Sequence, residues 1–247
     1  MTFAESVYAL SSSCPDAQPT PAICEALLKN ATRCARAYSL PAPRVEFASR
    51  IGAIDDPNAV DVHWVPDWSG PEFAGQDLSD AIAFHTIMNG RRVIYVSWAA
   101  VQVNGGTLTG PDGLVSATSH EINEDQCDPL IPAPILVTNP QGQREPREVA
   151  DRLQGNDYCE QGSDGIYVSD ALIPSGWDTA TPANDVVNIA ADVDPSKAVR
   201  GPFPLLPGGY YEPLDEVPVF GERASARLVA RVSRRGARSG AVRAALR

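Results

Sequence analysis

The stretch Leu114-Val-Ser-Ala-Thr-Ser-His-Glu-Ile-Asn-Glu-Asp-Gln-Cys-Asp-Pro129 decides the fold, because it combines a helical apolar pattern with a cluster of ligand-type side chains. Four of its side chains recur at helical spacing and share one side of the predicted helix: Leu114, Val115, Thr118 and Ile122. Proline cannot continue a helix, so Pro129 predicts an end at Asp128, and the start is expected near Asp112.

Three side chains of this helix are expected to project together, because residues four apart lie on one face: His120, Glu124 and Asp128. One imidazole and two carboxylates suit Zn²⁺, and also Mn²⁺, Fe²⁺ or, with more oxygen ligands, Ca²⁺. Glu121 stands where the general base stands in His-Glu-x-x-His metalloproteases. A motif this short also occurs on exposed acidic faces. The apolar turns before it favour a helix that enters the core, where clustered carboxylates repel one another unless a cation or protons neutralise them.

A second acidic segment, Arg147-Glu-Val-Ala-Asp-Arg152, places Glu148 24 residues after Glu124. In gluzincin metallopeptidases a glutamate on a second helix supplies the third metal ligand, and an acid one turn later orients the first histidine. Glu148 resembles that ligand. Asp151 resembles that orienting acid, expected against the other ring nitrogen of His120. The alternative is an ordinary amphipathic turn in which both acids pair with the flanking arginines.

Other side chains are candidates for the same site or for the core. His85 is expected either to approach the metal or to be a core histidine. Tyr210 follows a Gly-Gly turn and is expected either to donate its phenol to an oxyanion, as a tyrosine does in several zincins, or to fill space in the C-terminal wrap with Tyr211. Cys127 and Cys159 are expected as buried thiols, with a bridge or a role as soft ligands as the alternatives.

Local patterns predict the remaining elements. Thr20, followed by a proline, is typical of a capped helix start, and the apolar spacing behind it predicts about five turns. Alternation predicts strands at Arg44–Ser49 and Val60–Val65, and Arg92–Val103 has the strongest strand pattern in the chain. Residues 174–220 show no regular pattern.

The net charge of −11 hides an asymmetry. Residues 222–247 contain eight arginines and one acid, which leaves 12 of the 20 basic and 30 of the 31 acidic residues, a net charge of −18, in residues 1–221. A nucleic-acid role is therefore not expected for the body of the protein. The Arg-rich tail is expected either to meet an acidic partner or nucleic acid, or to be solvated.

These patterns together predict one α+β domain at residues 44–221 with an irregular C-terminal wrap. An N-terminal arm and helix at residues 1–43 precede it, and a basic, flexible tail at residues 222–247 follows. The chain has no run of eighteen apolar residues, and its N-terminus lacks the pattern of a signal peptide. Neither a membrane span nor secretion is expected.

Several short motifs occur in a fixed order: Ala81-Ile-Ala-Phe-His-Thr86, the strand Val93–Trp98, Ser119–Pro129, Glu148-Val-Ala-Asp151, Asp164–Asp170 and Gly208-Gly-Tyr210. This series, over residues 78–212, resembles a family of uncharacterised proteins of tailed bacteriophages and prophage-bearing bacteria that carry Ser-His-Glu-x-x-Glu-x-x-x-Asp-Pro. The resemblance implies a zincin-like fold with the motif helix packed on a small mixed sheet. This chain departs from the peptidase pattern at Glu124, where peptidases have histidine. An anionic ligand makes a metal less Lewis-acidic, which weakens the case for hydrolysis.

The first functional hypothesis is a phage-associated structural component of the virion, located in a virion or in the host cytoplasm. Zinc held by His120, Glu124 and Glu148, with Asp151, Asp128 and His85 around it, would staple the C-terminal wrap. The N-terminal arm and the basic tail would dock on other virion proteins.

The second hypothesis is an active zinc metallopeptidase in which Glu121 is the general base and Tyr210 assists. Its peptide substrate would pair with Arg92–Trp98 as the edge strand of the sheet. The third hypothesis is a Ca²⁺-stabilised binding module with Asp128 and Asp151 as additional oxygen ligands.

Overall fold

The computed structural model describes residues 5–76, 78, 81–127, 135–163, 165–211, 213–214 and 219–220, and it is an α+β protein. Its strands are β1 (Val7–Ser12), β2 (Arg44–Phe47), β3 (Ala59–Val65), β4 (Ala83–Met88), β5 (Arg91–Ser97), β6 (Leu136–Thr138), β7 (Arg144–Pro146), β8 (Tyr158–Cys159), β9 (Tyr167–Val168), β10 (Tyr210–Tyr211) and β11 (Val219–Phe220). Its α-helices are α1 (Pro21–Ala37), α2 (Trp98–Val103) and α3 (Leu114–Cys127). Short 3-10 helices are η1 (Pro71–Phe73), η2 (Asp151–Leu153), η3 (Pro174–Trp177), η4 (Ala190–Asp192) and η5 (Pro195–Lys197).

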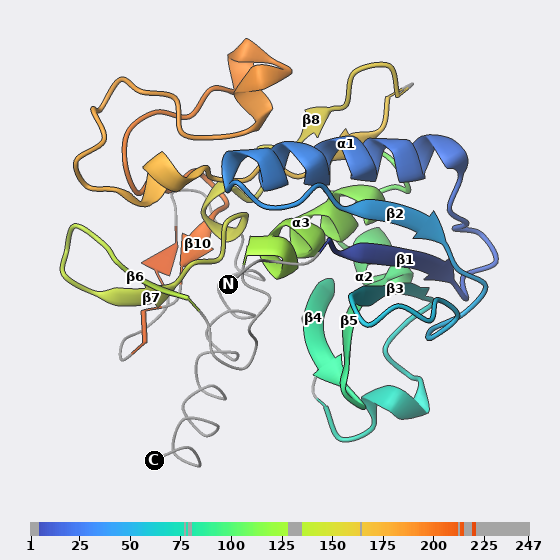
Figure 1. The fold of residues 1–247 in the computed structure, drawn as a ribbon. Coiled ribbons are helices and arrows are strands. Elements are labelled where there is room, and N and C mark those ends of the chain that lie inside the picture. The colour runs from blue at the N-terminus through green and yellow to red at the C-terminus, as the bar shows by residue number, and fades with distance from the viewer. Residues whose placement is uncertain are drawn as a thin grey trace.

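The main sheet is small and mixed, with strand order β2-β1-β3-β5-β4 (Figure 1). The pairs β1–β2, β1–β3 and β3–β5 are parallel, whereas β4 runs antiparallel to β5. Strand β4 therefore lies at one edge of the sheet, and β5 is an interior strand. This corrects the expectation that Arg92–Trp98 forms the edge.

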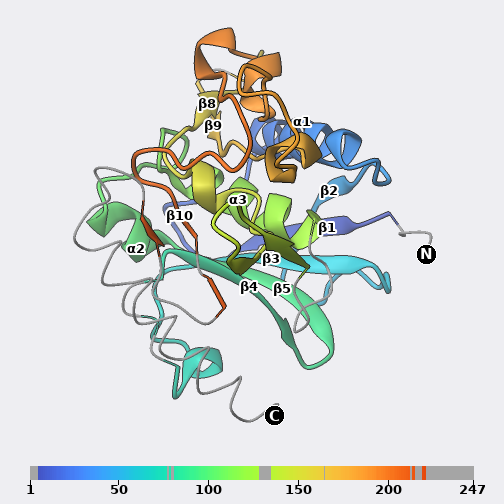
Figure 2. The same ribbon diagram turned by 90° about the vertical axis from the view of Figure 1, so that its left-hand side faces the viewer.

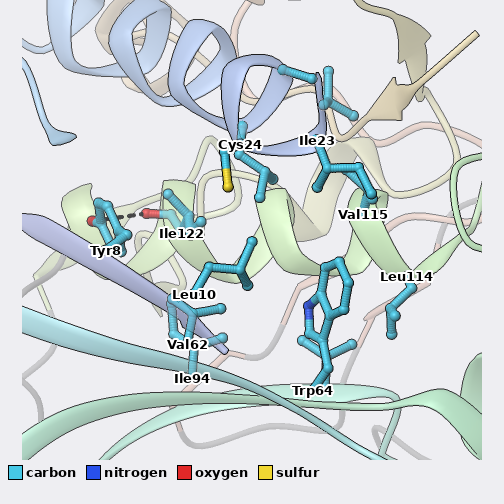
Figure 3. Close-up of a cluster of buried hydrophobic side chains, with 14 of the residues drawn as sticks. Tyr8, Leu10, Ile23, Cys24, Val62, Trp64, Ile94, Leu114, Val115 and Ile122 are labelled. Carbon is cyan, nitrogen blue, oxygen red and sulfur yellow. Dashed lines mark hydrogen bonds between the residues drawn. The ribbon is translucent and has the colours of Figure 1, made fainter. Parts of the chain in front are cut away.

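Helices α1 and α3 pack against each other on one face of the sheet, with α1 toward β2 and α3 over β4 and β5 (Figures 1 and 2). Figure 3 shows Leu10, Val62 and Trp64 pointing from the strands toward the two helices, where they meet side chains of α1 and α3. The sheet contributes alternate residues to this core, because successive side chains of a strand point to opposite faces.

The other face of the sheet is covered by the loop between β3 and β4. Trp68 and Phe73 of this loop pack with Phe84 and Tyr95 in an aromatic cluster whose ring centroids lie 5.0–6.4 Å apart. Both faces of β4 and β5 are thus covered. Alternate side chains of these strands face α3, and those between them face the aromatic cluster.

The N-terminal segment is part of the sheet rather than an arm attached to it. Strand β1 lies between β2 and β3, and α1 packs on α3. The boundary expected at residue 43 is therefore not a structural boundary. The start of α1 is as predicted: the Thr20 hydroxyl accepts a hydrogen bond from the backbone N–H of Ile23 at 3.2 Å.

The strong strand pattern of Arg92–Val103 is divided between two elements. Strand β5 ends at Ser97, whose side chain accepts a hydrogen bond from the backbone N–H of Ala100 at 3.2 Å and so begins α2. The prediction of strand beyond Ser97 was wrong, because β-branched and aromatic residues do not prevent a helix once its first turn is capped.

The described part of residues 174–220 has little regular structure, as predicted. Residues 174–211 contain three short 3-10 helices and the two-residue strand β10, and they are held by isolated bridges and side-chain contacts. Across the described ranges, no helix combines the length and apolar character needed to cross a bilayer.

Candidate metal centre

Helix α3 is buried along nearly its whole length, so its acids do not lie on a solvated face. Glu121 and Glu124 are only 6 % and 4 % exposed. At the start of the helix, the carboxylate of Asp157 accepts hydrogen bonds from the backbone N–H of Asp112 (2.7 Å) and the hydroxyl of Ser116 (2.6 Å). The burial of Glu121 and Glu124 excludes the alternative of an exposed acidic face.

Polar contacts with the sheet fix the rotation of α3 about its own axis. Arg92 of β5 pairs with Asp125 through two nitrogens, and the Tyr8 hydroxyl donates to Asp125 at 3.1 Å. Trp64 donates its indole N–H to the Thr118 hydroxyl at 2.8 Å. Buried polar contacts of this kind have few alternative geometries, so they orient the neighbouring acids of the helix.

The first ligand-type group is centred on His120. Its Nε2 lies 3.1 Å from Glu124 Oε1, one helical turn away, and 3.2 Å from Asp151 Oδ1 at the start of η2. The ligand atoms of these three residues all lie within 4.8 Å of one another. The structure therefore brings Asp151 to the histidine directly, where the sequence had predicted an orienting contact.

The second ligand-type group is centred on His85 of the edge strand. Ala83 packs in the core beneath α3, and His85, two residues further along β4, points to the same face. Its Nδ1 lies 2.8 Å from Glu121 Oε2 and 3.9 Å from Glu124 Oε2. Of the two alternatives for His85, the structure favours a place at the site over an isolated place in the core.

The surroundings of His85 favour its protonated form in the absence of a cation. Burial lowers the pKa of His85, but its hydrogen bond to Glu121 opposes this effect. The charges of Glu121, Glu148 and Glu124 add to the rise, and the pKa reaches about 10. The carboxylates therefore create a strongly negative environment around the imidazole.

The His120 group behaves in the same way. Burial lowers the pKa of His120, but the charge of Glu124 and the hydrogen bond to Asp151 raise it well above its ordinary value. Burial raises the pKa of Glu124, and although His120 lowers it, the charge of Asp151 raises it further. Positive charge is thus favoured in this group and additional negative charge is not.

The Glu124 side chain fits a cation better than it fits its protein neighbours. Its Oε1 is buried and, although it lies 3.1 Å from His120 Nε2, it makes no hydrogen bond of acceptable geometry. A buried carboxylate oxygen without such a bond is costly, and coordination to a cation removes the cost. The nitrogen-plus-oxygen donor sets suit Zn²⁺ or Mn²⁺, and imidazole is not a ligand that Ca²⁺ prefers.

The His120 group opens on a cleft of about 590 Å³, a volume that includes solvent at its mouth. His120, Glu121, Glu124 and Asp151 line it, and so does Tyr210 of β10. Tyr210 is also buried, at 3 % exposed, so its position fits both alternatives, and its catalytic role stays a prediction.

The neighbouring tyrosine has a packing role. Tyr211 stacks on the guanidinium of Arg152, with 4.0 Å between the guanidinium carbon and the ring centroid, and its hydroxyl donates to Gln143 at 3.2 Å. Tyr211 therefore fills space in the wrap, whereas Tyr210 faces the cleft.

Glu148 lies near the site but outside both ligand-type groups. It is not on a helix: it lies in an irregular segment between β7 and η2. The second helix expected from gluzincin metallopeptidases is therefore absent at this position. Its carboxylate is close enough to raise the pKa of His85. Asp128, the other predicted neighbour of the metal, lies outside the described residues.

The arginines beside this segment have other partners than Asp151. Arg152 binds Glu145 through two nitrogens at 2.5–3.0 Å, and Arg147 donates to the backbone carbonyl of Cys127 at 2.7 Å. The alternative of an amphipathic turn that pairs Asp151 with the flanking arginines is thus not what the structure adopts.

Of the two thiols expected to be buried, Cys127 is buried and Cys159 is exposed. The sulfur of Cys127 lies 3.4 Å from that of Cys34 on α1. The thiols of Cys34 and Cys127 thus belong to the contact between α1 and α3.

Sequence reasoning did not foresee the contact between His85 and Glu121, or the role of Asp157. The first depends on how α3 crosses β4, which no local pattern encodes. The role of Asp157 is only weakly indicated by the sequence: an acid is a common partner for the free N–H groups of a helix start, but nothing in the sequence shows which acid it is.

The chain was compared with profiles of known protein families, with curated proteins and with solved structures, and none of them matches it. The resemblance to proteins of tailed phages stays a prediction, and the case for function rests on the geometry of the site.

Proposed function

We propose that this protein is a zincin-like, metal-dependent hydrolase that acts on peptide bonds. The observation that carries the proposal is the convergence of His120, Glu124 and Asp151 on one point that opens into a cleft. A purely structural metal site is typically closed, whereas a catalytic site keeps an open position for substrate.

The cation would be held by His120 Nε2, Glu124 Oε1 and Asp151 Oδ1, with Zn²⁺ or Mn²⁺ as the ions that suit these donors. When bound, it would act as a Lewis acid on a substrate carbonyl. Glu148 remains a further candidate ligand, as the sequence predicted, because its charge acts on His85, next to this group.

Glu121 has the position and environment of a proton acceptor. It lines the cleft beside the His120 group, and His85 donates a hydrogen bond to its Oε2 at 2.8 Å. That contact holds the carboxylate in place, and the carboxylate would accept a proton from the water that attacks the substrate. Tyr210 lines the same cleft, and its phenol is suited to donate a hydrogen bond to an oxyanion.

Strand β4 supplies a place for an extended substrate. It has a strand neighbour on one side only among the described strands, and Ala83 at its start lines the cleft. An extended peptide added to this edge would run past the His120 group, with main-chain hydrogen bonds providing affinity. The edge role expected for Arg92–Trp98 thus passes to β4.

The test is hydrolysis of a quenched-fluorescent peptide library by the full chain loaded with Zn²⁺ or Mn²⁺. Glu121→Gln is expected to lower kcat by about 100-fold or more while the protein still folds. Glu25→Gln, an exposed change of the same chemistry on α1, is the matched control and is expected to keep full activity. Equal activity of wild type and Glu121→Gln would refute the catalytic role.

A second candidate function is a structural one, in a virion component whose cation staples the C-terminal wrap. Asp151 lies on η2, whereas His120 and Glu124 lie on α3. A cation bound by all three would therefore tie the segment that begins the wrap to the motif helix, which favours this candidate. This candidate predicts that metal removal lowers thermal stability strongly and that no peptide in the library is cleaved.

A further inference from the structure

Glu124 belongs to two ligand-type groups at once. Its Oε1 faces His120 Nε2 at 3.1 Å, and its Oε2 faces His85 Nδ1 at 3.9 Å. The His120 group is completed by Asp151 and the His85 group by Glu121, and within each group the ligand atoms lie within 4.8 Å of one another. One carboxylate therefore joins two separate sets of donors, each containing an imidazole.

We propose that the centre takes two divalent cations, with the Glu124 carboxylate bridging them. The first is the ion at His120, Glu124 Oε1 and Asp151, which is the metal site of the proposed function, and the paired centre rests on that site. The second is held by His85 Nδ1, Glu121 Oε2 and Glu124 Oε2.

The distances suit this arrangement. A small divalent ion bound at about 2 Å from each ligand holds neighbouring ligand atoms about 3.0–3.5 Å apart. The separations from His120 Nε2 to its two oxygens are 3.1 and 3.2 Å, and those from His85 Nδ1 are 2.8 and 3.9 Å. Only small side-chain movements are needed to close either group around an ion. Paired metal sites place their ions about 3.5–4 Å apart, a span that one bridging carboxylate can cover.

The charge of the site also matches two ions. Four carboxylates surround the two imidazoles: Glu121, Glu124, Asp151 and Glu148. The side chains of the first three are 6–11 % exposed, so their charges are poorly screened by water. When both imidazoles are neutral ligands, two divalent ions balance the charge of these four carboxylates.

The second ion would change what Glu121 does. Without it, Glu121 Oε2 lies 2.8 Å from His85 Nδ1 and is not coordinated. Binding of the second ion between these two atoms makes both side chains ligands. A coordinated Glu121 is no longer available as a proton acceptor, so the doubly loaded protein is the less active form and the second ion is an inhibitor.

The test uses Mn²⁺, since the five thiols of the chain compete for Zn²⁺ but bind Mn²⁺ poorly. Equilibrium dialysis of the full, metal-free chain gives the stoichiometry, and electron paramagnetic resonance reports whether two ions are close enough to couple. Wild type is expected to bind two equivalents with a coupled signal. His85→Ala is expected to bind one equivalent with the signal of an isolated ion.

His63→Gln is the matched control. His63 lies in β3, contacts Ser11 at 2.7 Å and the ring of Tyr95, and belongs to neither ligand-type group. It is expected to bind two equivalents. Glu121→Gln, an isosteric change, repeats the His85 test should His85→Ala not fold, and it too is expected to bind one equivalent. Circular dichroism establishes which variants are folded.

Each outcome bears on the proposal. One equivalent in wild type, unchanged in His85→Ala, overturns the second site and leaves the His120 site and the hydrolase intact. Two equivalents in both proteins place the second ion elsewhere and also overturn it. Two coupled equivalents in a wild type that cleaves no peptide, whether loaded with one equivalent of metal or with two, support the paired site and defeat the proposed function instead. No bound Mn²⁺ or Zn²⁺ in wild type defeats both.

Discussion

Asp125 illustrates how a single residue on α3 serves the site without taking part in it. Its carboxylate accepts from Arg92 on one side and from Tyr8 on the other, while Glu124 beside it points into the cleft. Neighbouring helix residues point about a hundred degrees apart, so a firm anchor at one sets the direction of the other.

Replacing Asp125 by Asn is expected to destabilise the protein by about 3 kcal/mol, because Arg92 would lose its charged partner in a largely buried place. Urea unfolding followed by circular dichroism measures the change. Asp56→Asn, which weakens an exposed pair with Arg44, is the control and is expected to cost less than about 1 kcal/mol. Similar costs for the two variants would show that Asp125 is not an anchor.

Asp170 permits a prediction about pH. Burial raises its pKa to about 7, although four N–H donors, from Asn156, Asn188, Ala171 and Ala190, favour the ionised form. A pKa raised on folding contributes stability that is fully present below the unfolded value of 3.8 and is lost as pH rises toward 7.

The stability of wild type relative to Asp170→Asn is therefore expected to fall between pH 4 and pH 7, by at most about 1.4 kcal/mol per pH unit. Above pH 7 the difference should be constant. Urea unfolding of both proteins across this range tests the prediction. A difference that grows with pH would mean that the four donors lower the pKa of Asp170 in the folded protein.

At the scale of elements, the site is assembled where β4, α3, η2 and β10 meet. Gly209 allows β10 to pack closely on η2, because a Cβ at this position would lie 2.2 Å from the backbone oxygen of Arg152. The close approach brings β10 against η2, which places Tyr210 and Asp151 on the same cleft.

Gly209→Ala is expected to push β10 away from η2, and so to weaken metal binding about 10-fold or more through the displacement of Asp151. Isothermal titration with Mn²⁺ measures the affinity. An affinity equal to that of wild type would show that β10 does not support the metal ligands.

The elements also show where sequence reasoning succeeds and where it stops. The motif helix was predictable because apolar spacing and a following proline mark its extent, and α1 because Thr20 caps it. Strand β1 was missed because a central parallel strand is buried on both faces and shows no alternation. The meeting of His85 with Glu121 depends on strand register and helix position, which are properties of the tertiary structure.

At the scale of the whole molecule, the first 43 residues supply part of the main sheet and of the core. Strand β1 lies inside the sheet, and α1 covers part of the core with α3. A chain that begins at residue 44 is therefore expected not to fold, as circular dichroism would show. A chain that ends at residue 221 keeps every ligand of the proposed centre, which all lie within residues 85–151, and is expected to bind metal like wild type. A folded chain without residues 1–43 would contradict this account of the sheet.

The central claim is that His120 and its neighbours form a metal centre, and elemental analysis after loading with Mn²⁺ or Zn²⁺ and exhaustive dialysis tests it most directly. Wild type is expected to retain at least one equivalent of metal, His63→Gln to match it, and His120→Ala to lose the ion shared with Glu124 and Asp151. A wild-type protein that retains no metal, or a His120→Ala variant that retains as much as wild type, would contradict the account.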